Sequence, residues 1–326
     1  MPNNEPQEKE QDVETRKESS VILVRLIVLG SFLIISLFVF DSSIFNVNKT
    51  DVIATPTQAI APISPFKYIS IKANAAYVYD LAENKVLFSK NEQSQLPLAS
   101  LTKLMTALVA SELISSDSII TIKENSILID GDNGFHINER WKFKDLLDYT
   151  LLVSSNDGAN AIAINAGSFI NDIKQEDVRL RFIYKMNQTA ESLGLTQSYF
   201  INESGLDTNT QISGGYGSAR DVASLLSYII SNKPQLLGAT VYQTLNFVSE
   251  DKFIYNATNT NPTVGDIPGL IASKTGFTDL AGGNLAIAFD AGINHPIVVV
   301  VLGSSFEGRF RDVERLVNAS IKEISL

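Results

Sequence analysis

The order in which strand-like and helix-like patterns follow one another is the feature that most limits how this 326-residue chain can fold. Strand-like stretches near both ends enclose a long middle part with helical periodicity, and an amphipathic helix closes the chain. We predict strands at 75–80, 85–89, 119–129, 240–248, 270–274, 284–289 and 297–302, and helices at 100–110, 143–152, 157–168, 177–193, 218–230 and 309–324. This order predicts an α+β fold, in which an antiparallel sheet flanked by helices is interrupted by an inserted, mostly helical subdomain.

A different pattern occupies the first 67 residues. Residues 1–20 are polar and mixed in charge, which predicts a disordered tail. Val21 to Phe40 is an apolar run with the length of one bilayer crossing, and it lacks the polar face of a buried core helix. Residues 41–67 contain three prolines and predict an extended linker, so that the folded domain spans 68–326.

Basic residues lie mainly on the N-terminal side, with Lys9, Arg16 and Lys17 before the apolar run and Arg25 near its N-terminal end. The positive-inside rule then predicts a single-pass protein of the cell membrane, with the tail in the cytoplasm and the folded domain outside. A cleaved signal peptide is the alternative, although no convincing small-x-small cleavage site follows Phe40. N-terminal sequencing of the mature protein discriminates the two.

Composition excludes several function classes. A formal net charge of −10 argues against a nucleic-acid partner, which calls for basic patches. The chain has no cysteine, so thiol nucleophiles, disulfides and Cys-ligated metals are excluded. The two histidines, His136 and His295, lie beside no nucleophile motif, and we expect neither a metal nor a cofactor.

The composition leaves open a serine hydrolase with a lysine base, and Ser100 with Lys103 has the required spacing. Three residues apart at the start of a helix, the two side chains share one face. A serine hydroxyl needs a base within hydrogen-bond reach, and a lysine serves only if burial and nearby positive charge keep its amine neutral. Taken alone this pair is more typical of an ordinary helix start with a solvated lysine, and Ser-x-x-Lys also occurs at Ser64 and Ser249.

Two further motifs follow in order. Ser154-Ser155-Asn156 lies at a junction of two predicted helices, where polar residues are usually caps. Lys274-Thr275-Gly276 lies on a late predicted strand and precedes Phe277; its glycine is also typical of a bulge. Neither motif is specific by itself.

Together, Ser-x-x-Lys, Ser-x-Asn and Lys-Thr-Gly form the ordered signature of penicillin-recognising serine acyl-transferases. Over roughly residues 70–320 the chain most resembles the D-alanyl-D-alanine carboxypeptidases, which are low-molecular-mass penicillin-binding proteins. The phrases Asn202-Glu203-Ser204-Gly205-Leu206 and Ser218-Ala219-Arg220-Asp221 strengthen the resemblance. It implies a β-lactamase/transpeptidase-like fold, peptidoglycan pentapeptide as substrate and covalent binding of β-lactam antibiotics.

The resemblance also implies residue roles. Ser100 attacks the carbonyl between two D-alanines and Lys103 takes its proton. Ser154 and Asn156 complete the proton network and hold the substrate amide. Lys274 and Thr275 attract the terminal carboxylate, beside Gly276, and the backbone N–H groups of Ser100 and Phe277 form an oxyanion hole.

The sequence departs from the family pattern in two places. Ser155 replaces a common glycine, which is tolerated if its side chain points away from the site. We expect the C-terminal β domain and amphipathic membrane helix of many relatives to be missing, and the predicted anchor is N-terminal instead.

Two other functions stay open on the same fold. A serine β-lactamase needs a dedicated deacylating group, for which Glu191 is the nearest candidate, and rapid cephalosporin turnover would identify it. A non-catalytic cell-wall-binding protein would bind peptidoglycan and release no D-alanine.

Overall fold

The structure is a computed structural model that describes residues 64–127, 134–171 and 173–326. The predicted tail, the predicted anchor Val21–Phe40 and most of the predicted linker lie outside these residues. Within the described part of the chain, no helix combines the length and the apolar character needed to cross a bilayer. All the described residues belong to the compact unit that begins at Pro62.

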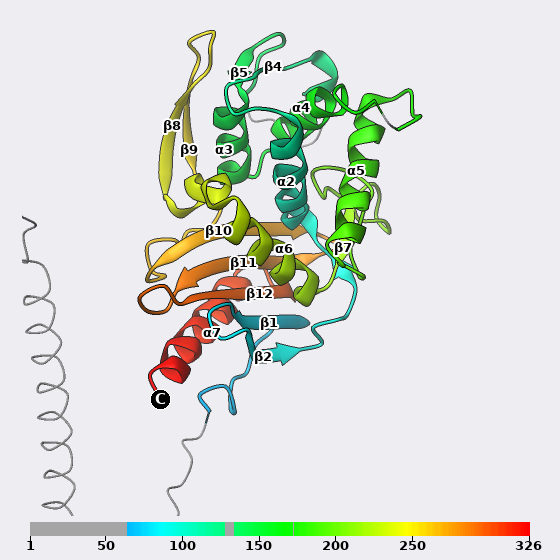
Figure 1. Cartoon of the computed structure of the whole chain (residues 1–326). Coiled ribbons are helices and arrows are strands. Elements are labelled where there is room, and N and C mark those ends of the chain that lie inside the picture. The colour runs from blue at the N-terminus through cyan, green and yellow to red at the C-terminus, as the bar shows by residue number, and fades with distance from the viewer. Residues whose placement is uncertain (1–63, 128–133, 172) are drawn as a thin grey trace, which may run out of the picture. The chain divides into compact units, whose positions relative to one another are not determined.

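An antiparallel sheet of five strands forms the centre of this unit, in the order β10-β11-β12-β1-β2 (Figure 1). Its strands come from both ends of the chain, as the sequence predicts. They are β1 (Ala75–Asp80), β2 (Lys85–Lys90), β10 (Leu270–Thr278), β11 (Gly282–Asp290) and β12 (Pro296–Ser304). The continuous apolar run in β12 reflects its central position, because both faces of a central strand are covered.

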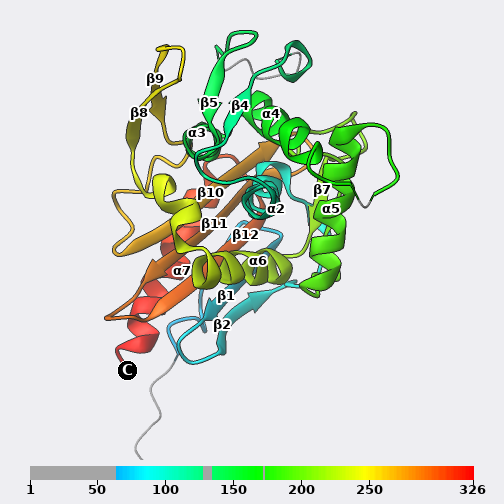
Figure 2. The same ribbon diagram turned by 45° about the horizontal axis from the view of Figure 1, so that its top comes forward.

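Successive side chains of a strand point to opposite faces of the sheet, so each strand contributes to two separate hydrophobic cores. On β12, Val298, Val300 and Leu302 join the core beneath the helices, whereas Ile297, Val299 and Val301 join a second core under the C-terminal helix. That helix, α7 (Gly308–Ile324), covers one face of the sheet, and α6 (Ala219–Asn232) crosses the other (Figure 2). The sheet is therefore the middle layer of three.

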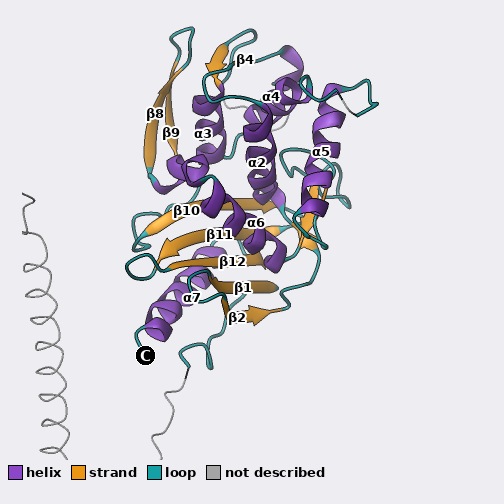
Figure 3. Ribbon diagram, in the orientation of Figure 1, coloured by secondary structure: helices purple, strands orange, loops and turns teal. Residues whose placement is uncertain are grey.

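The inserted helical part packs on the α6 side of the sheet (Figure 3). Its helices are η1 (Ala99–Thr102), α2 (Lys103–Leu113), α3 (Phe143–Val153), α4 (Asn156–Gly167) and α5 (Val178–Ser192). The α2 helix is buried along most of its length, with Met105, Leu108 and Val109 inaccessible to solvent. The helices α4, α5 and α6 pack against α2, and η1 before it contacts β10 and β11, so the first turn of α2 is held where it meets the sheet.

Short elements complete the chain, and they differ from some of the predicted ranges. They are β3 (Leu96–Pro97), β4 (Ile119–Thr121), η2 (Glu124–Ser126), β5 (Arg140–Lys142), β6 (Tyr199–Phe200), β7 (Gly215–Gly217), η3 (Pro234–Val241), β8 (Thr244–Val248) and β9 (Ile254–Thr258). The strand predicted at 119–129 ends at Thr121, and the one predicted from 240 begins at Thr244. The η3 turn takes up residues 240–241 of the predicted strand and buries Thr240, so local β propensity yields to tertiary packing there.

The folded unit reaches slightly further toward the N-terminus than residue 68. Phe66 is buried and stacks on Phe88 with their ring centroids 5.7 Å apart. The Ser64 hydroxyl donates to Glu323 Oε2 at 2.7 Å. These contacts bind the start of the described chain to β2 and α7.

Candidate active site

Ser100 lies in η1, the single helical turn that leads into α2. The residue before it, Ala99, has a φ of 47°, a left-handed conformation that residues with a Cβ atom rarely adopt. Asn284 on β11 donates from Nδ2 to the carbonyl oxygens of Pro97 and Leu98, at 3.0 Å each. The sheet thereby holds a strained backbone turn directly before the candidate nucleophile.

Lys103 begins α2, and its amine lies beside the Ser100 hydroxyl. The Nζ atom is 2.8 Å from Ser100 Oγ, 2.8 Å from Asn156 Oδ1 and 2.9 Å from the Ser204 carbonyl oxygen. A neutral amine can donate two hydrogens to the Asn156 and Ser204 oxygens. Its lone pair then accepts the Ser100 proton, which is the arrangement of a general base.

Burial makes that neutral form accessible near neutral pH. The Lys103 residue is 1% exposed, and desolvation lowers the pKa of its amine to about 7, against an opposing effect of the Glu203 carboxylate. An exposed lysine would be almost fully protonated at that pH. The structure thus gives the pair both the geometry and the proton affinity for base chemistry.

The junction between α3 and α4 supplies Ser154 and Asn156. Ser154 ends α3 in a left-handed conformation, with φ 63°, and Asn156 begins α4. Between them, the Ser155 hydroxyl accepts a hydrogen bond from the Gly158 N–H at 2.9 Å and caps α4. The Ser155 side chain is therefore used in helix capping.

Lys274 and Thr275 arrive from β10 on the opposite side. The buried Lys274 amine donates to Ser154 Oγ at 2.8 Å and to the Thr275 carbonyl at 2.8 Å. Its pKa lies well below the usual value because of burial, the nearby Lys103 and Arg309. Two lysines from distant segments therefore flank the two serine hydroxyls.

Gly276 lets β10 approach the nucleophile closely. A Cβ atom at this position would lie 2.8 Å from the Leu98 carbonyl oxygen and 3.2 Å from the Ser100 backbone nitrogen. Any other residue would intrude at the Ser100 N–H. The next residue, Phe277, is 45% exposed at the rim of the site.

These groups meet in one pocket of ≈ 400 Å³. Ser100, Ser154, Asn156, Thr275, Gly276 and Phe277 line it, together with Leu206, Thr260, Thr278, Phe306 and Arg309. Lys103 and Lys274 are buried behind the two serines. The structure thus brings together all eight residues that the sequence singled out.

Arg309 is the principal site residue that sequence reasoning missed. It is 3% exposed, stacks over the Phe306 ring at 4.5 Å and donates from Nη1 to the Gly276 carbonyl at 2.7 Å. Burial lowers its pKa to about 10, and its Nε has no partner among the described residues. The available signal was a cation in the first turn of a helix, where the macrodipole disfavours positive charge.

Other candidates lie away from the pocket. Glu191 is exposed near the end of α5, His136 stacks on Phe253, and His295 bonds to Asp80. None of the three lines the pocket around Ser100. Within the described residues, no group of three or more His, Asp or Glu side chains is arranged to hold a metal ion.

Comparison with known proteins agrees with this geometry. The sequence profile of the family described as D-alanyl-D-alanine carboxypeptidase matches residues 58–305. The D-alanyl-D-alanine carboxypeptidase DacF of Bacillus subtilis is 29% identical over 240 residues, which are 72% of this chain and 58% of that protein. The D-alanyl-D-alanine endopeptidase of Escherichia coli is 27% identical over 85% of this chain and 87% of its own length.

Solved structures share the fold. Penicillin-binding protein D2 of Listeria monocytogenes in its cefotaxime-bound form superimposes with a TM-score of 0.64 and 27% identity, over 77% of this chain and 98% of that one. The profile match spans well over half of the sequence and includes all three motifs. The chain belongs to the peptidase S11 family, the D-alanyl-D-alanine carboxypeptidases.

Proposed function

We propose that the protein is a serine-type D-Ala-D-Ala carboxypeptidase that removes the terminal D-alanine from peptidoglycan stem peptides through an acyl-enzyme on Ser100. The observation that carries this proposal is the buried Lys103 amine, 2.8 Å from Ser100 Oγ. β-Lactam antibiotics would acylate the same hydroxyl, because their strained amide presents a carbonyl to the same nucleophile. Family membership supports this activity, and the DacF relative carries it in its name.

Acylation begins at the Ser100 hydroxyl. Its proton passes to the neutral Lys103 amine while Oγ bonds to the carbonyl carbon between the two D-alanines. The resulting oxyanion would accept hydrogen bonds from the backbone N–H groups of Ser100 and Phe277, which both line the pocket. Asn156, held by Lys103, is placed to bind the substrate amide.

The leaving D-alanine needs a proton on its nitrogen. Ser154 Oγ, hydrogen-bonded to Lys274, lies on the pocket wall and is placed to deliver one, and the proton that Lys103 took from Ser100 replaces it. The C–N bond then breaks and D-alanine departs. A water molecule attacks the ester carbonyl and passes a proton to the neutral Lys103 amine. The C–O bond breaks, Ser100 Oγ takes that proton, and the shortened stem peptide leaves with its new carboxylate.

Basic side chains make the pocket suited to an anionic C-terminus. Arg309 and Thr275 both line the pocket and Lys274 is buried behind Ser154, so a carboxylate bound there would pair with the buried guanidinium. A bound carboxylate also favours the ammonium form of Lys274. Substrate binding is therefore coupled to proton uptake at this lysine.

An endopeptidase is the second candidate, and the names of some relatives favour it. The B. subtilis relative is named a carboxypeptidase, whereas the E. coli relative, of which 87% is matched, is named an endopeptidase. Both reactions use the same acyl-enzyme and differ in the amine that leaves. Comparing release of D-alanine from a pentapeptide with cleavage of a cross-linked stem-peptide dimer decides between them.

We also propose that residues 21–40 anchor the protein in the cell membrane, with residues 1–20 in the cytoplasm and the catalytic domain, 68–326, outside it. The apolar run and the distribution of basic residues around it support this location. An extracytoplasmic site is also where peptidoglycan stem peptides are found.

Release of D-alanine from diacetyl-Lys-D-Ala-D-Ala tests the proposed activity directly. We expect turnover by the wild-type chain and none by Ser100→Ala. Rapid hydrolysis of a chromogenic cephalosporin without peptide turnover would instead identify a β-lactamase. Peptidoglycan binding without either reaction would identify a non-catalytic wall-binding protein.

A further inference from the structure

A buried carboxylate that the mechanism above does not use lies directly behind the candidate base. Glu203 is 0% exposed and belongs to the loop between β6 and β7. Glutamate is almost never fully buried unless its charge is paired. Its burial this close to the site therefore calls for an explanation.

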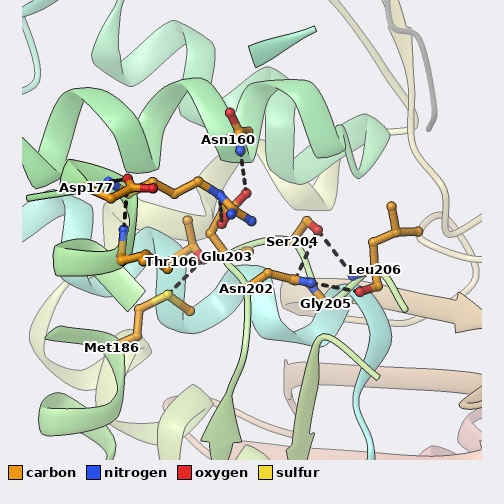
Figure 4. A network of polar contacts seen from close by, with 11 residues as sticks. Thr106, Asn160, Asp177, Met186, Asn202, Glu203, Ser204, Gly205 and Leu206 are labelled. Carbon is orange, nitrogen blue, oxygen red and sulfur yellow. Dashed lines mark hydrogen bonds and ion pairs between the residues drawn. The ribbon is translucent and has the colours of Figure 1, made fainter. Parts of the chain in front are cut away.

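Two helices hold the Glu203 carboxylate by both oxygens. Asn160 on α4 donates from Nδ2 to Oε1 at 2.8 Å, and Arg179 on α5 donates from Nε to Oε2 at 2.9 Å (Figure 4). The Arg179 side chain is 33% exposed, so this ion pair is closed to solvent on the glutamate side only. The carboxylate joins α4 and α5 at a single point.

The backbone carbonyl groups of Glu203 and of the next residue, Ser204, are both bound to α2. Thr106 donates from Oγ1 to the Glu203 carbonyl at 2.6 Å, and Lys103 donates from Nζ to the Ser204 carbonyl at 2.9 Å. Thr106 lies one helical turn after Lys103. The hydrogen bond from Thr106 fixes the peptide group between Glu203 and Ser204. That peptide group in turn orients the Ser204 carbonyl, which accepts a hydrogen bond from the candidate base.

The loop is also fixed on its far side. Asn202 Oδ1 accepts from the Gly205 N–H at 2.7 Å (Figure 4), and Gly205 adopts a φ of 78°. A Cβ atom on Gly205 would lie 1.9 Å from the Ala99 carbonyl oxygen, so the loop packs tightly against the turn that carries Ser100. Movement of the loop would therefore disturb both Ser100 and Lys103.

We propose that Glu203, clamped by Asn160 and Arg179, is a positioning residue for the acylation step: it fixes the Ser204 carbonyl that orients the Lys103 amine toward Ser100. This inference rests on the proposed function, because it gives Glu203 a role in that same reaction. Glu203 contacts neither the pocket nor the reacting atoms, so it acts through Lys103.

The negative charge of Glu203 has a second effect on the same amine. Burial lowers the pKa of Lys103 to about 7, and the Glu203 carboxylate raises it against that trend. Other charged groups on the elements around this amine are Asp157 at the start of α4, Lys274 on β10, Arg309 on α7, and Arg179 on α5. Arg179 partly cancels the field of Glu203 at Lys103 because it is bound to the carboxylate.

Removing the charge of Glu203 and removing the charge of Arg179 should shift the pKa of Lys103 in opposite directions. Glu203→Gln keeps the volume and the acceptor for Asn160 but removes the charge, so the Lys103 pKa falls. Arg179→Gln keeps the carboxylate and removes its cation, so the Lys103 pKa rises. Glu112→Gln makes the same chemical change as the first variant at an exposed position near the end of α2, and serves as the control.

The experiment measures the rate of Ser100 acylation by a fluorescent penicillin from pH 5 to 9 in the full chain and the three variants, with melting curves for each. The acidic limb is the part of the pH–rate profile in which the acylation rate falls because Lys103 is protonated. We expect this limb to lie about one pH unit lower in Glu203→Gln than in wild type. At pH 5 the variant's rate, relative to its own plateau, is then about tenfold higher than that of wild type. The limb of Arg179→Gln should move up, and that of Glu112→Gln should coincide with wild type.

A purely structural role predicts a different result. Both variants would then lower the melting temperature and leave both the plateau rate and the acidic limb of acylation in place, which overturns the inference. If Glu203→Gln fails to fold, the direction of the Arg179→Gln shift alone decides. A wild-type protein that is never acylated refutes the proposed function, whereas an acylated wild type with unshifted variants refutes the role of Glu203 only.

Discussion

The amine of Lys103 and the hydroxyl of Ser100 are 2.8 Å apart, although the amine belongs to a side chain that is almost entirely enclosed by protein. Enclosure is what makes the contact chemically useful, because it lowers the pKa of the amine to about 7. The same contact between exposed side chains would pair a hydroxyl with an ammonium that has no lone pair to offer.

The acylation rate should therefore rise with pH. Below about pH 7 the Lys103 amine gains a proton and cannot accept another, so the rate should fall about tenfold per pH unit. Above that value the amine is neutral and the rate should reach a plateau. Stopped-flow acylation by a fluorescent penicillin at constant ionic strength measures this profile, and a rate that is flat from pH 5 to 9 would exclude Lys103 as the base.

Removal of either member of the pair should abolish covalent labelling. Ser100→Ala removes the nucleophilic oxygen and Lys103→Ala removes the proton acceptor, so neither should yield a labelled band with fluorescent penicillin. Ser89→Ala and Lys85→Ala, at exposed positions on β2, provide matched controls that should label as wild type. Normal labelling of a folded Lys103→Ala variant would require another base.

The sequence predicted the fold most reliably where packing repeats along an element. The strands near both ends and the helices between them lie where periodicity placed them, since one buried face dictates the spacing of apolar residues. Short β4 and the η3 turn departed from prediction. Local β propensity at residues 240–241 could not reveal that they end a helical turn whose Leu236 and Leu237 pack in the core.

The site shows a similar division. Motif residues could be singled out because their order along the chain is distinctive, and all of them meet around one pocket. Glu203 was visible only as part of a phrase, and Arg309 only as the start of an amphipathic helix. Their involvement depends on how α5, α7 and the loop before β7 pack, and no spacing rule encodes that packing.

Arg309 should govern affinity for substrates with a free C-terminal carboxylate. Arg309→Gln removes a buried cation from the pocket that Thr275 also lines, and a charge-assisted hydrogen bond of this kind corresponds to about a 10–100-fold change in affinity. We expect KM for diacetyl-Lys-D-Ala-D-Ala to rise by that factor, with a smaller effect on kcat. Arg311→Gln, exposed two residues later on α7, is the control. An unchanged KM would remove Arg309 from carboxylate recognition.

The predicted anchor should decide where the protein is found. With residues 21–40 present, the chain should sediment with membranes and resist extraction by high salt or alkaline carbonate, because a bilayer-spanning helix is held by apolar burial. A chain that begins at residue 41 should be soluble and should still label with penicillin. N-terminal sequencing of the membrane-bound form separates an anchor from a signal peptide, and a mature start near residue 44 would refute the anchor.

Gly276→Ala tests whether close approach of β10 to the nucleophile matters for catalysis. The added methyl group would lie 2.8 Å from the Leu98 carbonyl, which cannot easily withdraw because Asn284 also binds it, and 3.2 Å from the Ser100 nitrogen. Displacing the Ser100 N–H from the developing oxyanion should lower the acylation rate by about 10²–10³.

The control for that substitution is Gly265→Ala, where a methyl group meets nothing within 4 Å and the backbone is not left-handed. It should acylate and melt as wild type. Gly276→Ala should lose far more acylation rate than thermal stability, because the strain falls on the turn that carries Ser100 while the two cores stay intact. Equal acylation rates in the two variants would show that the space between Gly276 and Ser100 is not needed for the reaction, and would remove the Ser100 N–H from the proposed oxyanion hole.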